Sequence, residues 1–280
     1  MAHARTTSAR TAMLLVSALG TVLLLATTSV MAQEADDAKQ LDGQFIELYR
    51  QGKYEEAIPL AEKALEIRLR LLDGDKADVS QNLNDVAASL ANLGELFRST
   101  GRFDKAEPLL LRAADIKKKL SGPDVDYSHV LNILALLYND MGRYDKAEPI
   151  YLEAAEIRRL ILGPEHPEYA TILNNLALLY RNTGRYDKAE QLYLQSIEIT
   201  RKRGSETHAH ATTLNNLGLL YSITGRYDKA EPLYLQASEI IKRAAGADHP
   251  DYAMSLNNLA LKTIMLNTTS LLVTLITSSP

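Results

Sequence analysis

Pairs of carboxylates recur along this chain with a fixed spacing of three residues. The pairs are Asp104/Glu107, Asp145/Glu148, Asp187/Glu190 and Asp228/Glu231. Two neighbouring carboxylates could act as a general acid and a general base. The same residues also suit the first turn of a helix, where unpaired N–H groups and the helix dipole favour acceptors. Because four copies of one active site along a single chain make little sense, the sequence predicts helix caps.

Histidines are the other residues that could do chemistry. His166, His249, His208 and His210 lie in turns, with His129 nearby. A metal site needs several such side chains to converge, yet these turns are one repeat apart, so turn or capping roles are favoured. The chain has no cysteine, and it lacks the usual serine-elbow, phosphate-loop and zinc-helix motifs. We therefore predict no catalytic residues, no metal site and no cofactor.

One stretch of sequence is repeated along the chain. TGRYDKAEPLYLQA occupies residues 224–237, and similar stretches begin at residues 100, 141 and 183. Their glycines, Gly101, Gly142, Gly184 and Gly225, are 41, 42 and 41 residues apart. Repetition at a period of this size indicates a stacked array.

Each repeat contains two helical patterns separated by a glycine. In LNNLALLYRNTG (173–184) the apolar residues follow steps of three and four, and a second stripe follows in YDKAEQLYLQSIEI (186–199). Glycine between them supplies the left-handed backbone that ends a helix. One such hairpin cannot bury its own stripe, whereas stacked neighbours can. The predicted fold class is all-α, an α-solenoid of stacked antiparallel helix pairs.

The fourteen tyrosines could form a stacking platform, but their distribution favours packing. Nine of them occupy three repeated positions: Tyr138, Tyr144 and Tyr151; Tyr180, Tyr186 and Tyr193; Tyr221, Tyr227 and Tyr234. A residue type that recurs once per repeat at a fixed place is expected in the core and between helices.

The repeats also define the domain organisation. Residues 36–73 form a degenerate first helix pair, and residues 78–261 form an array of four full repeats plus the first helix of another. Gly52 and Gly101 are 49 residues apart, one period of 42 plus seven. Since seven residues are about two helical turns, the insertion preserves the inward face. We predict one elongated helix containing QNLNDVAASLANLGELF (81–97) rather than an extra loop.

The two ends differ in composition from the repeats. Residues 1–32 have a basic start, a short apolar run (13–26) and small residues before Gln33, which predicts a signal peptide and an exported, periplasmic or secreted protein. The alternative is a membrane anchor at residues 13–30. Residues 262–280 form an atypical apolar tail without charge after Lys262. Either the chain is truncated or frame-shifted there, or the tail docks on the last groove.

Charge excludes one class of partner. The formal net charge is −4, and lysine and arginine alternate with glutamate and aspartate along every repeat. A nucleic-acid-binding protein normally shows a basic face or stripe. We predict no nucleic-acid partner, and no membrane span after signal cleavage.

The residues at fixed places in each repeat resemble the tetratricopeptide repeat. They are Leu176, Ala177, Tyr180, Ala189 and Tyr193, with Leu217, Gly218, Tyr221, Ala230 and Tyr234 in the next repeat. The 41- to 42-residue spacing, the Gly-x-x-His-Pro turn and the following Leu-Asn-Asn-Leu are more similar to the kinesin light chain type. The resemblance is strong over residues 84–261 and weaker upstream, where Gln44, Phe45 and Leu48 replace the usual first-helix residues.

The resemblance implies a peptide-binding groove lined by the first helices. The candidate groove residues are Asn132, Asn174, Asn215 and Asn257, with Arg98, Asn139, Arg181 and Asn182 further along the first helices. Uncharged amides could bond the backbone of an extended peptide, since each offers a donor and an acceptor. Alternatively, one asparagine of each pair bonds across to the next repeat, which we favour for the neighbouring set, Asn92, Asn175, Asn216 and Asn258.

These observations predict an exported scaffold that binds a peptide or protein partner in its concave groove without catalysis. Two alternatives stay open. The array could be the non-catalytic arm of a larger enzyme or signalling protein whose effector domain is missing, or a structural spacer in an envelope assembly. The sequence fixes neither the partner nor the oligomeric state.

Overall fold

The computed structural model describes residues 29–74, 79–202, 204, 207–246 and 252–259. All regular secondary structure in these residues is helical. The helices belong to two compact units, Met1–Leu120 and Ser121–Pro280, which are described separately below. The predicted all-α fold of antiparallel helix pairs is confirmed.

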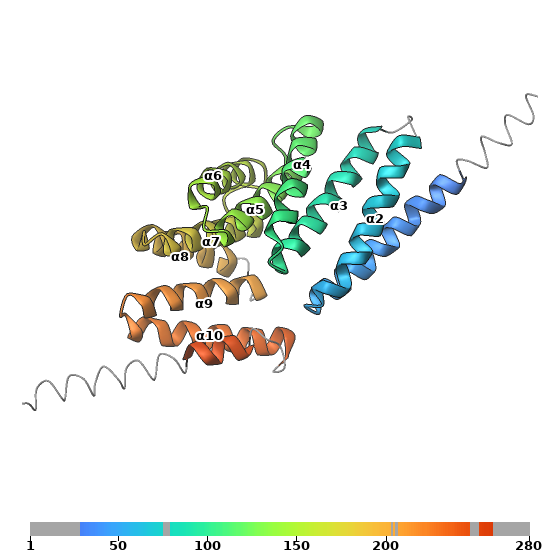
Figure 1. Ribbon diagram of the computed structural model, residues 1–280. Helices are drawn as coiled ribbons and strands as arrows, with labels where there is room; N and C mark the ends of the chain where they lie inside the picture. The colour runs from blue at the N-terminus through green and yellow to red at the C-terminus, as the bar shows by residue number, and fades with distance from the viewer. Residues whose placement is uncertain (1–28, 75–78, 203, 205–206, 247–251, 260–280) are drawn as a thin grey trace, which may run out of the picture. The chain divides into compact units, whose positions relative to one another are not determined.

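The first unit contains a helix at residues 29–50, followed by α2 (Tyr54–Gly74), α3 (Val79–Ser99) and α4 (Phe103–Ser121) (Figure 1). Helix α3 spans 21 residues, whereas α5, α7 and α9 of the second unit span 16 each. The predicted elongated helix is therefore confirmed, although α2, at 21 residues, is also longer than its counterpart α6 at 18, so the extra residues are shared by two helices. Helices α3 and α4 pack closely at Gly94, where a Cβ atom would lie 2.7 Å from the side chain of Leu110.

The second unit contains three helix pairs. They are α5 (Val125–Asp140) with α6 (Tyr144–Ile161), α7 (Pro167–Asn182) with α8 (Tyr186–Lys202), and α9 (His208–Ile223) with α10 (Tyr227–Ala245), as Figure 1 shows. A further helix covers residues 252–259. The second helix of one pair packs on the first helix of the next, and α7 also contacts α5 and α9.

The core of the second unit is formed by the apolar faces of its helices, which the sequence pattern predicted. Tyr151, Tyr193 and Tyr234 are among the largest fully buried side chains. Tyr138, Tyr180 and Tyr221 are also buried, so the packing prediction is confirmed at two of the three repeated positions. At the third position the rings of Tyr144 and Tyr227 are half-buried and that of Tyr186 is exposed.

The turns between paired helices end at the repeated glycines. Gly142, Gly184 and Gly225 have φ angles of 71°, 73° and 74°, which only glycine adopts without strain. The prediction that the repeated aspartates cap the second helices is wrong for α6 and α10, the two second helices whose N-cap residue is identified. Arg143 and Arg226 occupy the N-caps of α6 and α10 and make no side-chain cap bond. The aspartates lie one residue inside the helix, where their charge still faces the positive end of the dipole.

The glutamate of the repeated pair joins one repeat to the next. Glu148 of α6 accepts hydrogen bonds from the Tyr180 hydroxyl (3.1 Å) and from Nη1 of Arg185 (2.9 Å). The Arg185 guanidinium lies 4.3 Å from the centre of the Tyr180 ring. This Glu–Tyr–Arg clamp therefore connects the second helix of one pair to the first helix of the next.

The clamp recurs one repeat later. Glu190 accepts from Tyr221 (2.9 Å) and Arg226 (2.7 Å), and Arg226 lies 4.4 Å from the Tyr221 ring centre. Burial raises the pKa of Glu190, but the bonds from Arg226 and Tyr221 lower it, and the net shift is downward. Because the same three residue types recur with the same geometry, the clamp is a property of the repeat rather than of one site.

Most of both terminal segments lies outside the described residues. These are residues 1–28 of the predicted signal peptide and all of the predicted tail at 262–280. In the described ranges, no helix combines the length and the apolarity needed to cross a membrane. In the helix at 252–259, Leu256 is 42% exposed, whereas Leu214, its counterpart in α9, is 2% exposed.

Candidate peptide-binding face

The first helices of the second unit share one partly exposed face. We call it the first-helix face, and it consists of three repeated positions on α5, α7 and α9. The positions hold His129, Thr171 and Thr212; Leu136, Leu178 and Leu219; and Asp140, Asn182 and Ile223, all exposed or half-buried. Steps of seven and four residues along each helix place these positions on one side. On this face, equivalent polar and leucine side chains of successive repeats therefore lie at equivalent places.

The predicted asparagines lie beside this face, at different depths. Asn174 and Asn215 are buried, Asn132 is half-buried and Asn257 is exposed. Asn175 donates to Oδ1 of Asn132 (3.0 Å) and accepts from Asn174 (3.2 Å), and Asn216 donates to Oδ1 of Asn174 (3.0 Å). The amides thus form a chain across three first helices. In both sets the structure thus contains members that bond to the next repeat, which is the alternative inferred from the sequence: Asn132 and Asn174 in the first set, and Asn175 and Asn216 in the second.

Asn215 has a different partner. Its Nδ2 donates to Oγ of Ser255 in the helix at 252–259 (2.7 Å). Its Oδ1 is buried and has no partner among the described residues. This asparagine therefore also connects neighbouring first helices, through a serine instead of a second amide.

The other candidate residues fall into two groups. Asn139 is buried and accepts from Asn182 (3.4 Å), whose Oδ1 accepts from Arg181 (3.3 Å). These three lie together at the C-terminal ends of α5 and α7. Arg98 belongs to the first unit, where it pairs with Glu95 (2.7 Å). The structure thus brings seven of the eight candidates to one unit and leaves Arg98 in the other.

Two hollows open between the first helices, at equivalent places in successive repeats. The first, of about 440 Å³, is lined by Val125, Asp126, His129, Asn132, Arg158, Glu168, Thr171 and Ile172. The second, of about 260 Å³, is lined by Thr171, Asn174, Asn175, Ser196, Thr200, His208, Ala209, Thr212 and Thr213. Two of the predicted groove asparagines, Asn132 and Asn174, therefore line hollows, although most of the lining residues were not predicted.

A charged group forms one wall of the first hollow. Arg158, only 6% exposed, donates from Nε to the Ser128 hydroxyl (2.8 Å) and forms an ion pair with Glu168. Burial lowers the pKa of Arg158, and the charge of Asp126 raises it. The guanidinium thus lies within reach of two carboxylates. Among the lining residues, with His129 neutral, the formal charge is −1.

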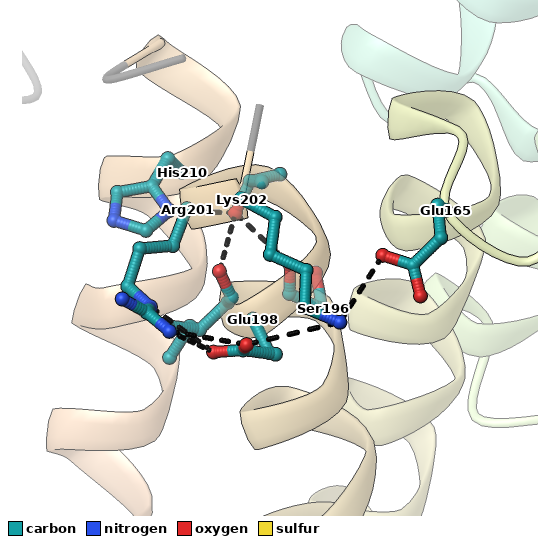
Figure 2. Close-up of polar contacts among 8 residues, drawn as sticks. Glu165, Ser196, Glu198, Arg201, Lys202 and His210 are labelled. Carbon is teal, nitrogen blue, oxygen red and sulfur yellow. Dashed lines mark hydrogen bonds and ion pairs between the residues drawn. The ribbon is translucent and has the colours of Figure 1, made fainter. Parts of the chain in front are cut away.

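The second hollow has no charged carboxylate or guanidinium in its lining. Thr200 stands where Arg158 stands one repeat earlier, and Ala209 stands where Glu168 stands. The Thr200 hydroxyl lies 2.6 Å from Nδ1 of His210, which is buried. Figure 2 shows this region, where Lys202 lies between Glu165 (3.5 Å) and Glu198 (3.9 Å) on the surface. The charges here are thus outside the hollow.

One of the histidines has the capping role that the sequence favours. Nδ1 of His166 accepts from the backbone N–H of Glu168 (3.2 Å) and caps α7. His249 lies outside the described residues. In the described part of the chain, no group of three or more potential metal ligands comes together.

Stacked antiparallel helix pairs with a shared first-helix face define a helical-repeat protein. The tetratricopeptide repeat family profile matches residues 46–119, 126–202 and 210–266. The chain therefore belongs to the tetratricopeptide repeat family. The comparison with curated proteins gives no significant match.

Solved structures of the same fold support the kinesin light chain resemblance. BtubC (BKLC) from P. vanneervenii is 27% identical, with a TM-score of 0.62 over 75% of this chain and 82% of that one. A putative kinesin light chain from Podospora anserina is 21% identical, with a TM-score of 0.57 over 75% and 96%. A Rap protein complexed with competence and sporulation factor is 16% identical, with a TM-score of 0.59 over 82% and 65%. At these identities the last two show the fold alone.

Proposed function

We propose that this chain is an exported scaffold that binds an extended peptide or protein segment on its first-helix face and performs no chemistry. The observation that carries the proposal is the combination of two adjacent hollows with a row of half-buried leucines, Leu136, Leu178 and Leu219. Ligand sites usually combine apolar walls with a few placed polar groups. This face has both, repeated in register along three helices.

The amide chain contributes rigidity to the proposed face. Asn132, Asn175, Asn174 and Asn216 are already bonded to one another, so their main effect is to hold successive first helices in a fixed relation. An amide oxygen has two acceptor positions, and an amide nitrogen has two donors. The half-buried Asn132 and Asn175 therefore keep capacity for a ligand backbone, while Asn174 and Asn215 are too deeply buried to make first contact.

Tetratricopeptide repeat proteins are generally non-catalytic scaffolds, and the proposed function follows the family in this respect. The likeness to a Rap protein complexed with competence and sporulation factor supports a binding role only at the level of the fold. Export is proposed from the composition of residues 1–32. A reporter fused after residue 280, with and without residues 1–32, tests export separately from binding.

Affinity capture with the full chain tests the binding face. The paired variants are Leu178→Ser on the first-helix face and Leu194→Ser on α8, where the leucine is 47% exposed. We expect Leu178→Ser to lose the partners that the unaltered chain retains, and Leu194→Ser to keep them. Equal loss in both variants, or loss only with Leu194→Ser, would refute the assignment of the face.

A further inference from the structure

The two hollows differ in the chemistry that they offer to a ligand. In the second hollow, every hydroxyl of the lining threonines and serine is bonded to a backbone carbonyl. The bonds are Thr171 to Pro167 (3.2 Å), Thr212 to His208 (3.0 Å), Thr213 to Ala209 (3.0 Å), Thr200 to Ser196 (2.9 Å) and Ser196 to Ala170 (2.8 Å). Such bonds turn the hydroxyl toward the helix backbone and leave the threonine methyl groups to line the hollow.

The first hollow is lined by charged groups instead. Asp126 and Glu168 line it together with one buried cation, Arg158, so that with His129 neutral the formal charge of the lining residues is −1. Since nearby carboxylates stabilise a cation, this hollow favours a basic side chain. An acidic side chain would add a third carboxylate to the same recess.

The spacing of the hollows sets the spacing of the two side chains. The hollows are separated by one first helix, and packed helices lie about 8–10 Å apart. A polyproline II segment rises about 3.1 Å per residue and repeats its side-chain direction every three residues. Residues three apart in such a segment are therefore about 9 Å apart and point to the same side. This spacing agrees with the one expected for hollows that are one packed helix apart.

Resting on the proposed function, we propose that the bound segment carries a basic side chain in the first hollow and an apolar side chain, three residues away, in the second. Arg158 and Glu168 of the first hollow are replaced by uncharged residues at the equivalent places in the second hollow. This difference between the hollows then sets the register in which the ligand binds. Without it, successive repeats would present similar surfaces and an extended peptide could slide by one repeat.

Fluorescence anisotropy with capped, labelled peptides and the full chain tests this proposal. The peptides contain Lys-x-x-Leu, Leu-x-x-Lys, Gln-x-x-Leu or Glu-x-x-Leu in an otherwise constant Gly/Ser sequence, which separates the two directions of binding. We expect one of the two lysine peptides to bind about three- to five-fold more tightly than the glutamine peptide, as for a partly exposed ion pair. The glutamate peptide should bind more weakly than the glutamine peptide.

Two variants locate the effect. Asp126→Asn with Glu168→Gln should abolish the preference for lysine over glutamine, while the control pair Glu156→Gln and Glu239→Gln, exposed on α6 and α10, should keep it. Ala209→Glu places a carboxylate where Glu168 stands one repeat earlier. This variant should convert the second site to a preference for lysine over leucine.

The outcomes separate the two proposals. If none of the four peptides binds, and no member of a random peptide library binds either, the proposed function is wrong. If peptides bind but lysine has no advantage, or if the Asp126/Glu168 and control variants behave alike, the charge assignment is wrong while peptide binding stands. Circular dichroism of each variant shows whether the helical array is intact.

Discussion

The Glu–Tyr–Arg clamp predicts a measurable coupling between neighbouring repeats. Glu148 accepts from Tyr180 at 3.1 Å and from Arg185 at 2.9 Å, and the side chains of Glu148 and Arg185 are 27% and 32% exposed. Deleting a hydrogen bond to a charged group in a buried site costs about 1.5–3 kcal/mol. Because solvent screens this partly exposed pair, we expect Glu148→Ala to cost about 2 kcal/mol in total.

A double-mutant cycle separates the clamp from the general effects of substitution. Tyr180→Phe removes only the hydroxyl and should cost about 1 kcal/mol, and the coupling between Tyr180→Phe and Glu148→Ala should also be about 1 kcal/mol. Chemical denaturation followed by circular dichroism gives the free energies of unfolding. Glu156→Ala is the control, because the hydrogen bonds that Glu156 accepts come from Arg159 on its own helix.

The same experiment can refute the argument. A coupling near zero would mean that the contacts at Glu148 do not join the repeats energetically. A Glu148→Ala variant no less stable than Glu156→Ala would mean the same. Combining Glu148→Ala with Glu190→Ala should give additive losses, because each clamp joins a different pair of repeats.

Three further predictions concern stability. Burial, followed by the bond to Glu190, raises the pKa of Tyr221 from 10.0 to about 12. The contribution of Tyr221 to stability is therefore present below pH 10 and is lost as the pH rises toward 12. In alkaline unfolding titrations, the Tyr221→Phe variant should lose less stability over that interval than the unaltered chain. Gly184 has φ 73°, so Gly184→Ala should cost about 1–2 kcal/mol and Gly184→Asn clearly less, and equal costs would contradict the left-handed requirement. Asn174→Ala should cost about 1–3 kcal/mol, because it removes the donor to Oδ1 of Asn175 and the acceptor of Nδ2 of Asn216, whereas the exposed Asn257→Ala should be nearly neutral in the same denaturation assay.

The fold could be predicted because several levels of the sequence agree. Apolar residues at helical spacing, a glycine at each left-handed turn and a constant period all indicate the same arrangement of helix pairs. Even the seven-residue irregularity could be assigned in part to a longer first helix, α3, since two helical turns preserve the buried face. Such features depend on local geometry and repetition, which a single sequence contains.

The role of the repeated glutamate could not be predicted in the same way. Asp145 and Glu148 have the spacing of a capping box, but the helix begins earlier than this spacing implies, at Tyr144. Glu148 instead bonds residues 32 and 37 positions later in the chain. Contacts between repeats depend on how the helix pairs stack, which the local pattern does not specify.

The candidate site could be predicted only in part, because it too depends on how the helix pairs stack. The asparagine positions follow from the resemblance to the family, but their depth and mutual bonding depend on the approach of α5, α7 and α9. Asp126, His129 and Thr171 of the first hollow were not predicted. His129 and Thr171 each precede a predicted asparagine by three residues, so helical spacing was the signal that could have found them.

A site-specific photocrosslinker tests the binding face most directly. The crosslinking residue is placed at position 178 on α7 or at position 194 on α8 of the full chain, and the cells that produce the protein are irradiated. The account predicts a discrete crosslinked partner from position 178 and none from position 194. The crosslink from position 178 should disappear when the tighter-binding of the two lysine peptides is added as a competitor. Adducts from position 194 alone, or adducts from position 178 that the peptide does not displace, would contradict it.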